Sequence, residues 1–125
     1  MRILLVEDHR DSANMLALLL RGNGHDVLAV GTAGEAFRAC GEAAFDLLIS
    51  DIGLPDFDGW ELLARLRAHC AVPAIALTAF SSHADRERSR VAGFDAHLPK
   101  PVDFKTLVAV VSRYAGPDPT PPPKP

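Results

Sequence analysis

The stretch FDLLISDIGLPDFDGW, residues 45–60, runs from an apolar segment onto a carboxylate and then into a turn rich in Gly, Pro and Asp. Residues 47–49 are apolar enough for a strand that is buried on both faces of a sheet, yet the segment ends on Asp51. The start of the chain repeats this arrangement, since RILLVED ends on Glu7 and Asp8. Two apolar strands that end on acids suggest that the acids meet.

Five short apolar runs alternate with longer segments that carry helix signals. The runs are residues 3–6, 27–30, 47–49, 74–77 and 96–98. The helical segments open at Asp11 or Ser12, Thr32, Asp58, Ser82 and Asp103. Strict alternation predicts parallel strands joined by right-handed crossovers, and continuous apolar strands predict helices on both faces. The sequence therefore predicts an α/β fold, a doubly wound sheet of five parallel strands in the flavodoxin-like order 2-1-3-4-5.

The composition is that of a globular chain without a strong charge bias. Of the 125 residues, 48% are hydrophobic and 23% are charged, and the formal net charge is -3. This charge gives no electrostatic reason to expect nucleic-acid binding. No apolar run approaches the ~20 residues that span a bilayer, so we expect no membrane contact and a cytoplasmic location. Cys40 and Cys70 lie far apart without a CxxC pattern, which favours reduced thiols over a disulfide or a metal site.

The chain divides into a domain and a tail. Residues 1–115 carry all the strand and helix signals, whereas residues 116–125, GPDPTPPPKP, are mostly proline. A segment so rich in proline cannot pack a core, and we expect a flexible, extended tail. Pro119 and Pro122 formally make a PxxP pattern, but a plain linker is the simpler interpretation.

The acids at the strand ends meet in this topology. Ligands of open parallel sheets bind outside the carboxyl ends of the strands, where the strand order reverses. In the order 2-1-3-4-5 that point lies between the first and third strands, which end on Glu7 with Asp8 and on Asp51. Carboxylates so close together raise one another's pKa, and a hard cation such as Mg²⁺ relieves the repulsion. The alternative is that each acid is an ordinary loop or helix-cap residue.

Two further strand ends supply groups for the same site. The fourth strand ends on Thr78, a hydroxyl donor, and Lys100 follows the fifth strand between two prolines. Each has an ordinary alternative, Thr78 as a helix-entry residue and Lys100 as a solvated turn residue. Together with the acids they form a set suited to phosphoryl transfer. In this interpretation Asp51 is the nucleophile, and the cation, Lys100 and Thr78 stabilise the phosphoryl oxygens.

These segments resemble the receiver domain of two-component response regulators. The motifs LLVED, LLISDIGLPDFDGW, ALTA and LPKP occur in the family's order and at its separations across residues 1–115. Residues 73–101 are most similar to receivers attached to hybrid sensor histidine kinases, so the chain could belong to a larger hybrid kinase. The resemblance implies a signalling domain that takes a phosphoryl group from a phosphohistidine. The partner would be a histidine kinase or a histidine phosphotransfer protein.

The resemblance also implies roles for the acids and the lysine. Asp51 would be phosphorylated. The Mg²⁺ ligands would be the side chains of Asp8 and Asp51 and the backbone carbonyl of Gly53, with Glu7 acting through water. Lys100 would pair first with Asp51 and then with the phosphoryl group.

Other implied roles concern the response to phosphorylation. Thr78 would move toward the phosphoryl oxygen, and the peptide bond before Pro101 would be cis. His97 takes the place of a Tyr or Phe that turns inward in many members, and its burial would depend on protonation near neutral pH. Gly53 and Phe80 occupy the positions that tune hydrolysis of the acyl phosphate. Neither can orient a water molecule, which predicts slow self-dephosphorylation.

Two other functions fit parts of the pattern. A Mg²⁺-dependent phosphohydrolase would need a second acid two residues after the nucleophile, where this chain has Gly53. We therefore expect a signalling module that catalyses only its own phosphorylation and dephosphorylation. A receiver-like module that binds partners without phosphorylation would need a broken site, and the site residues are present.

The segment at residues 83–92 is the least apolar of the predicted helices. So little buried area predicts that this helix is loosely held and able to shift. Together with His97 and the last helix it would form the partner surface. A homodimer is compatible with the sequence.

Overall fold

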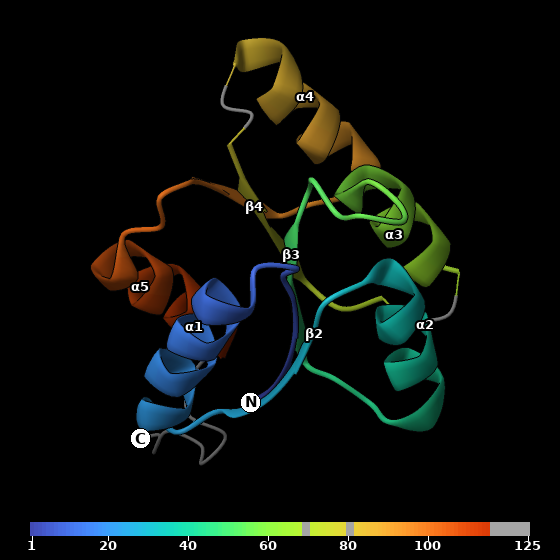
Figure 1. The fold of residues 1–125 in the computed structure, drawn as a ribbon. Coiled ribbons are helices and arrows are strands. Elements are labelled where there is room, and N and C mark those ends of the chain that lie inside the picture. The colour runs from blue at the N-terminus through green and yellow to red at the C-terminus, as the bar shows by residue number, and fades with distance from the viewer. Residues whose placement is uncertain (69–70, 80–81, 116–125) are drawn as a thin grey trace, which may run out of the picture.

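The computed structural model describes residues 1–68, 71–79 and 82–115, which form a parallel sheet between two layers of helices (Figure 1). The predictions made for Cys70, Phe80 and the tail at residues 116–125 lie outside the described residues. Within the described part, no helix is both long enough and apolar enough to cross a bilayer.

Strands and helices alternate along the whole described chain. The strands are β1 (Arg2–Val6), β2 (Asp26–Val30), β3 (Leu47–Asp51), β4 (Ala74–Thr78) and β5 (Ala96–Pro99). The helices are α1 (Arg10–Gly22), α2 (Ala33–Glu42), α3 (Gly59–Leu66), α4 (His83–Ala92) and α5 (Phe104–Ala115). All neighbouring strands pair in parallel, in the order β2-β1-β3-β4-β5. The α/β, doubly wound, flavodoxin-like fold predicted from the sequence is confirmed.

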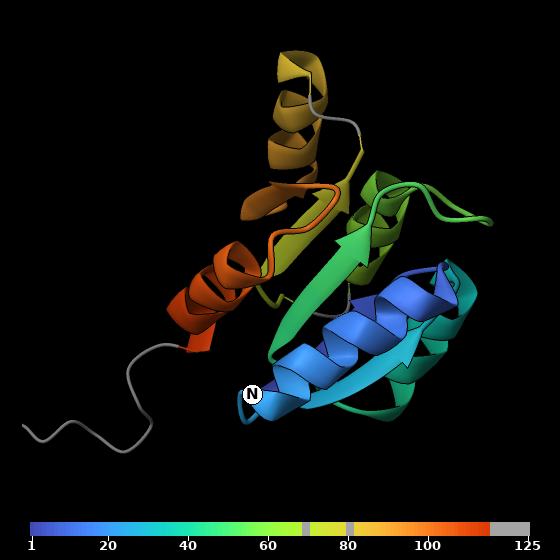
Figure 2. The same ribbon diagram turned by 60° about the vertical axis from the view of Figure 1, so that its left-hand side comes forward.

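Each face of the sheet has its own apolar core. Helices α1 and α5 cover one face and α2 and α3 the other, as the two ribbon views show (Figures 1 and 2). Successive strand residues point to opposite faces, so Leu5 packs in the α1–α5 core and Leu4 in the α2–α3 core. Burial on both faces explains why these strands read as continuous apolar runs. In the fully buried strands β3 and β4, the polar residues Ser50, Asp51 and Thr78 lie at the carboxyl ends.

The helix starts follow the predicted capping residues in three cases. The side chains of Thr32, Asp58 and Ser82 each accept a hydrogen bond from the backbone N–H three residues later. Helix α1 instead begins at Arg10, one or two residues before the predicted start at Asp11 or Ser12. The N–H of His9 donates to Glu7 Oε2 at 3.0 Å, which closes the turn after β1 and brings the helix start forward.

Helix α4 is held to the rest of the protein mainly by polar contacts. Ser89 is its one buried residue, and Val91 is 71% exposed. Trp60 on α3 donates through its indole N–H to Ser89 Oγ at 2.8 Å, and the Arg88 guanidinium lies 3.9 Å from the centre of the Trp60 ring. The helix extends from one end of the molecule in both ribbon views (Figures 1 and 2). This sparse packing agrees with the prediction of a loosely held helix.

Candidate functional site

Acids at the ends of two strands meet at the ammonium group of Lys100, which follows a third strand, β5. The Nζ of Lys100 lies 2.8 Å from Glu7 Oε1 at the end of β1 and 3.0 Å from Asp51 Oδ2 at the end of β3. The backbone N–H of Lys100 donates to the carbonyl of Thr78 at 2.9 Å, which joins the ends of β4 and β5. The Lys100–Pro101 peptide bond is cis, as the resemblance implies. The structure therefore brings together the acids, the threonine and the lysine that were predicted to share a site.

The two acids that contact Lys100 are both buried. Glu7 is 2% exposed and Asp51 is 6% exposed. Burial raises the pKa of Asp51, and the charge of Glu7 adds to the increase, although the hydrogen bond from Lys100 opposes it. Burial acts to lower the pKa of Lys100, but its bonds to Glu7 and Asp51 outweigh burial and the net shift is upward. Two buried carboxylates thus share one ammonium, which leaves the site with negative charge that a cation can compensate.

The turn after β3 shapes the backbone around Asp51. The N–H of Gly53 donates to Asp51 Oδ1 at 3.2 Å, so each carboxylate oxygen of Asp51 has a donor. Gly59 lies against this turn, and a Cβ there would be 2.6 Å from the carbonyl oxygen of Asp51 and 2.8 Å from Ile52 Cα. Real Cβ atoms do not approach a backbone so closely, so this position requires glycine. Gly59 was not among the predicted site residues. The Asp58–Gly59 pair in the turn after the apolar run is the sequence pattern that could have indicated a required glycine.

Asp56 ties the same turn to helix α2. Its carboxylate accepts hydrogen bonds from the backbone N–H groups of Ala33 at 2.9 Å and Gly34 at 3.0 Å. These bonds lower the pKa of Asp56. They also satisfy two N–H groups at the start of a helix, where no partner exists within the helix itself. No local pattern predicts this contact, because the partners lie more than twenty residues apart in the sequence.

The acids predicted as metal ligands lie in two connected groups. Glu7 and Asp8 form one cluster with His9, whose possible ligand atoms lie within 4.8 Å of one another. Asp51 is linked to Glu7 through Lys100. The donors are carboxylate oxygens in excess over one ammonium, a set that fits a divalent cation. His9 itself is an exposed loop residue, 76% exposed, and its Nδ1 lies 3.5 Å from Glu7 Oε2.

His97 lies on β5 with its ring partly enclosed. Neither ring nitrogen has a hydrogen-bond partner among the described residues. Burial lowers the pKa of His97, and the positive charge of Arg86 lowers it further, while Asp85 acts in the opposite direction. The neutral imidazole is therefore favoured at this position.

Known proteins share both the sequence pattern and the fold. The family profile described as "Response regulator receiver domain" matches residues 3–112. The chain belongs to the response regulator receiver family. Receiver domains are the phosphoacceptor modules of two-component signal transduction, so the resemblance drawn from the motifs is confirmed.

Two relatives by sequence are similar over nearly the whole receiver domain. The chain is 37% identical over 117 residues to an uncharacterized 14.6 kDa protein of Leptolyngbya boryana, covering 91% of this chain and 89% of that protein. It is 37% identical over 110 residues to the DNA-binding response regulator MtrA of Mycobacterium tuberculosis, covering 88% of this chain and 48% of MtrA. The receiver therefore spans about half the length of MtrA.

Solved structures of other receivers have the same fold. A response regulator from Chloroflexus aurantiacus superposes with a TM-score of 0.86 at 32% identity, covering 93% of this chain and 98% of that one. The chemotaxis response regulator CheY4 of Vibrio cholerae gives a TM-score of 0.85 at 26% identity, covering 90% and 97%. These similarities extend over the strands whose ends form the site.

Proposed function

We propose that this receiver accepts a phosphoryl group on Asp51 from a phosphohistidine of a partner protein, in a Mg²⁺-dependent reaction. The observation that carries the proposal is the ammonium of Lys100 between the buried carboxylates of Glu7 and Asp51, at 2.8 and 3.0 Å. One ammonium balances one carboxylate, so the second buried acid leaves a negative charge that a divalent cation can compensate. The bound cation can then stabilise the phosphoryl oxygens.

Asp51 has the features of a carboxylate nucleophile. It ends a buried strand, and hydrogen bonds from Gly53 and Lys100 hold both of its oxygens. Burial raises its pKa, and a more basic carboxylate is a stronger nucleophile. An oxygen–phosphorus bond forms while the nitrogen–phosphorus bond of the phosphohistidine breaks, and the leaving imidazole keeps the electron pair. Lys100 and the hydroxyl of Thr78 would then stabilise the phosphoryl oxygens.

The carboxylates provide a site for Mg²⁺. Asp8, Asp51 and the backbone carbonyl of Gly53 would hold the ion directly, and Glu7 would act through water. When bound, Mg²⁺ supplies positive charge to the phosphoryl oxygens. The burial of Glu7 and Asp51 supports this assignment, because their charges are only partly compensated by Lys100.

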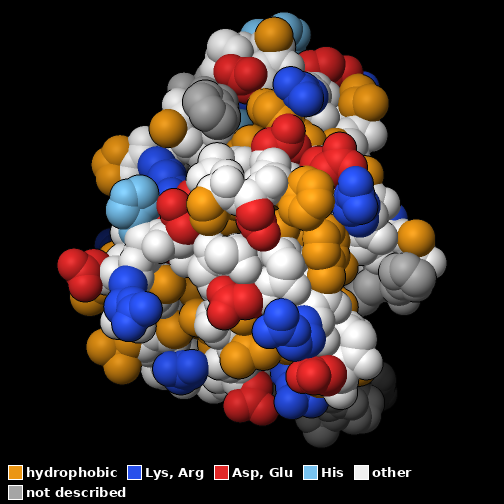
Figure 3. Space-filling model, turned by 45° about the vertical axis from the view of Figure 1, so that its right-hand side comes forward, with side chains coloured by type: hydrophobic (Ala, Val, Ile, Leu, Met, Phe, Trp, Pro, Cys, Tyr) orange, Lys and Arg blue, Asp and Glu red, His pale blue; other side chains and the backbone are white. Residues whose placement is uncertain are grey.

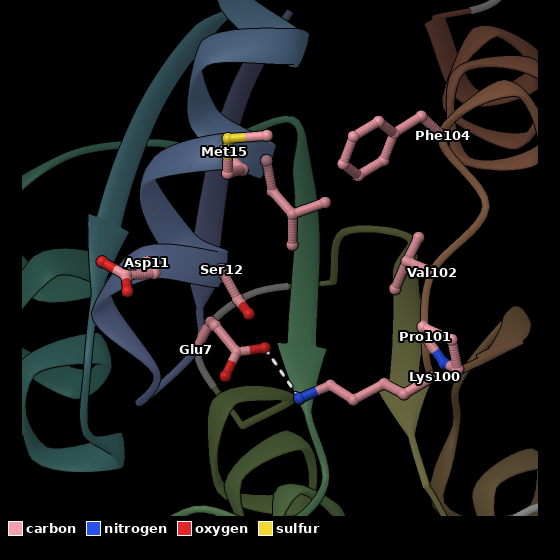
Figure 4. A pocket seen from close by; sticks show the side chains of 9 residues that line it. Glu7, Asp11, Ser12, Met15, Lys100, Pro101, Val102 and Phe104 are labelled. Atoms are coloured by element: carbon pink, nitrogen blue, oxygen red, sulfur yellow. Dashed lines mark ion pairs between the residues drawn. The ribbon is translucent and has the colours of Figure 1, made fainter.

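A groove beside Lys100 is suited to the phosphodonor protein. It has a volume of about 310 Å³ and lies between α1 and the segment that leads into α5. Met15 and Phe104, which are 53% and 41% exposed, face one another across it, and Glu7 and Lys100 form its polar end (Figure 4). We propose that a helix of a histidine kinase or a histidine phosphotransfer protein packs on this apolar groove and presents its phosphohistidine to Asp51.

Phosphorylation with a small-molecule donor tests the function. The protein is incubated with acetyl phosphate, with and without Mg²⁺, and the intact mass is measured for wild type and for Asp51→Asn. One added phosphoryl group that requires Mg²⁺ and is lost in the variant supports the proposal. No addition to wild type would instead favour a receiver-like module that binds its partner without phosphorylation.

The lifetime and the cellular setting complete the proposal. Gly53 carries no side chain to orient a water molecule, so we expect slow self-dephosphorylation; the second tuning position, Phe80, lies outside the described residues. We propose that the receiver acts in the cytoplasm without membrane contact, alone or as part of a hybrid kinase, and that α4, His97 and α5 form its partner surface. A homodimer is compatible with the sequence.

We also propose that this domain itself does not bind nucleic acid. The formal net charge of the chain is -3, and acidic and basic side chains are interspersed on the face seen in Figure 3. MtrA is named as DNA-binding, but the receiver covers only 48% of it.

A further inference from the structure

We propose that Asp56 is a positioning residue for the cation site: it holds the loop between β3 and α3 on helix α2 and so fixes the backbone carbonyl of Gly53. The inference rests on the proposed function, in which that carbonyl is a Mg²⁺ ligand. Asp56 touches neither the ion nor the phosphoryl group, so it changes the affinity for Mg²⁺ and not the reaction itself.

The backbone of Gly53 has no side chain to hold it in place. The residue is exposed, and a Cβ at this position would have open space around it. Its N–H donates to Asp51 Oδ1 at 3.2 Å, and it pairs with Asp58 in an isolated antiparallel bridge at the base of the loop. Glycine has more conformational freedom to lose than any other residue. The position of the Gly53 carbonyl therefore depends on how firmly the rest of the loop is held.

Asp56 fastens the middle of this loop to helix α2. Its Oδ1 accepts the N–H of Ala33 at 2.9 Å, and its Oδ2 accepts the N–H of Gly34 at 3.0 Å. Both N–H groups belong to the first turn of the helix, where the helix dipole favours a negative charge. These bonds lower the pKa of Asp56, so its carboxylate is charged at neutral pH. Each carboxylate oxygen therefore has its own donor on α2.

An aromatic contact brings the same loop against the same helix. The ring of Phe57, next to Asp56 in the sequence, packs edge-on against the ring of Phe37 on α2, with 5.8 Å between the ring centres. On the other side, the guanidinium of Arg65 on α3 lies 4.8 Å from the centre of the Phe57 ring. The apolar contact keeps the loop near α2, and the directional hydrogen bonds of Asp56 set the path of its backbone there.

The alternative is that Asp56 serves only as a cap of α2. The two interpretations differ in what they predict for the folded protein. A cap stabilises the domain against unfolding and leaves the Mg²⁺ affinity of the folded domain unchanged. A positioning residue sets that affinity, because a loosely held ligand loses more conformational entropy when the ion binds.

Titration with MgCl₂, followed through the backbone amide NMR signals, distinguishes the two interpretations. The proteins are wild type, Asp56→Ala, Asp56→Asn and, as a matched control, Asp46→Ala. Asp46 is also an exposed acid that accepts a backbone N–H, from Arg2 at 2.8 Å. It directly precedes β3, so it lies at the amino end of the strand whose carboxyl end carries Asp51.

The affinity for Mg²⁺ should follow the number of acceptor oxygens at position 56. We expect Asp56→Ala to bind Mg²⁺ about 10-fold more weakly, the lower end of the range for outer-sphere partners of metal ligands. Asp56→Asn keeps one acceptor oxygen and should lie between Asp56→Ala and wild type, and Asp46→Ala should bind as wild type does. At saturating Mg²⁺ all these proteins should react with acetyl phosphate at the same rate.

Three results would overturn the inference. The first is equal Mg²⁺ affinity in wild type and Asp56→Ala, or no Mg²⁺ binding in wild type. The second is an equal loss of affinity in Asp46→Ala, which would mean that only the negative charge matters. The third is slower phosphorylation of Asp56→Ala at saturating Mg²⁺, which would mean that Asp56 acts on the reaction itself.

The proposed function and this inference can fail separately. A wild-type protein that binds Mg²⁺ but takes up no phosphoryl group would refute the proposed function. The Mg²⁺ affinities of the Asp56 variants would still decide whether Asp56 positions the cation site.

Discussion

Replacing Lys100 by methionine removes its charge and keeps most of its length. The structure places its ammonium 2.8 Å from Glu7 and 3.0 Å from Asp51, whose side chains are 0% and 8% exposed. Breaking a buried ion pair typically lowers the free energy of unfolding by about 3–5 kcal/mol. Because the side chain of Lys100 is 25% exposed, we expect the lower end of that range, about 3 kcal/mol. This is a large part of the ~5–15 kcal/mol that stabilises an ordinary domain.

The loss in Lys100→Met should depend on pH, because Asp51 can relieve it by binding a proton. Burial already raises the pKa of Asp51 above its ordinary value of 3.8, and loss of Lys100 should raise it further. The folded state then binds the proton more tightly than the unfolded state. The free energy of unfolding of the variant should therefore fall as the pH rises from 3.8, the ordinary pKa of the carboxyl, through the raised pKa of Asp51 in the folded state. The variant should be closest to wild type at acidic pH.

Urea unfolding at acidic and neutral pH, in the presence of a chelator, measures both effects. Lys105→Met is the matched control, because Lys105 is exposed on α5. Adding Asp51→Asn to Lys100→Met should recover part of the stability, since one of the uncompensated carboxylates is then gone. The electrostatic account is refuted if Lys100→Met stays within about 0.5 kcal/mol of wild type, as an ordinary surface substitution does. An equal loss at both pH values would also contradict it.

Three further changes test separate parts of the structure. Gly59→Ala should lower the free energy of unfolding in urea by about 1–3 kcal/mol, because the added Cβ would lie 2.6 Å from the carbonyl oxygen of Asp51, the last residue of β3. Gly53→Ala is the control and should not destabilise the fold, because a Cβ there has open space around it. Trp60→Phe removes the hydrogen bond to Ser89 and should speed hydrogen exchange in α4 but not in β1 or β3; unchanged exchange in α4 would contradict the tether. Because burial lowers the folded pKa of His97, wild-type stability should rise as pH increases from that pKa toward 6.5. His97→Phe should flatten this rise in urea unfolding, and an unchanged slope would exclude His97 as its source.

The fold was predictable because its signals are local. Apolar runs such as residues 47–49 specify strands buried on both faces, and polar residues such as Thr32 and Asp58 mark helix starts. Parallel strands bring their carboxyl ends to one edge, so Asp51 and Lys100 could be assigned to one site from their positions after strands.

Other parts of the site depend on how loops cross one another, which sequence spacing does not reveal. Asp56 caps α2 from a loop more than twenty residues away. The ammonium of Lys100 contacts Glu7 as well as Asp51. The second contact depends on the conformations of the Lys100 and Glu7 side chains, which the sequence does not specify. The turn after β1 brings the imidazole of His9 beside the carboxylates of Glu7 and Asp8, and the path of that turn is not specified by the sequence pattern.

The central claim is that Asp51, rather than another acid at the sheet edge, accepts the phosphoryl group. The most direct test is to phosphorylate wild-type protein with acetyl phosphate and Mg²⁺, reduce the acyl phosphate with borohydride, and locate the reduced residue by peptide mass spectrometry. The account predicts one reduced residue, at position 51. A reduced residue at Glu7 or Asp8, or none, would contradict it.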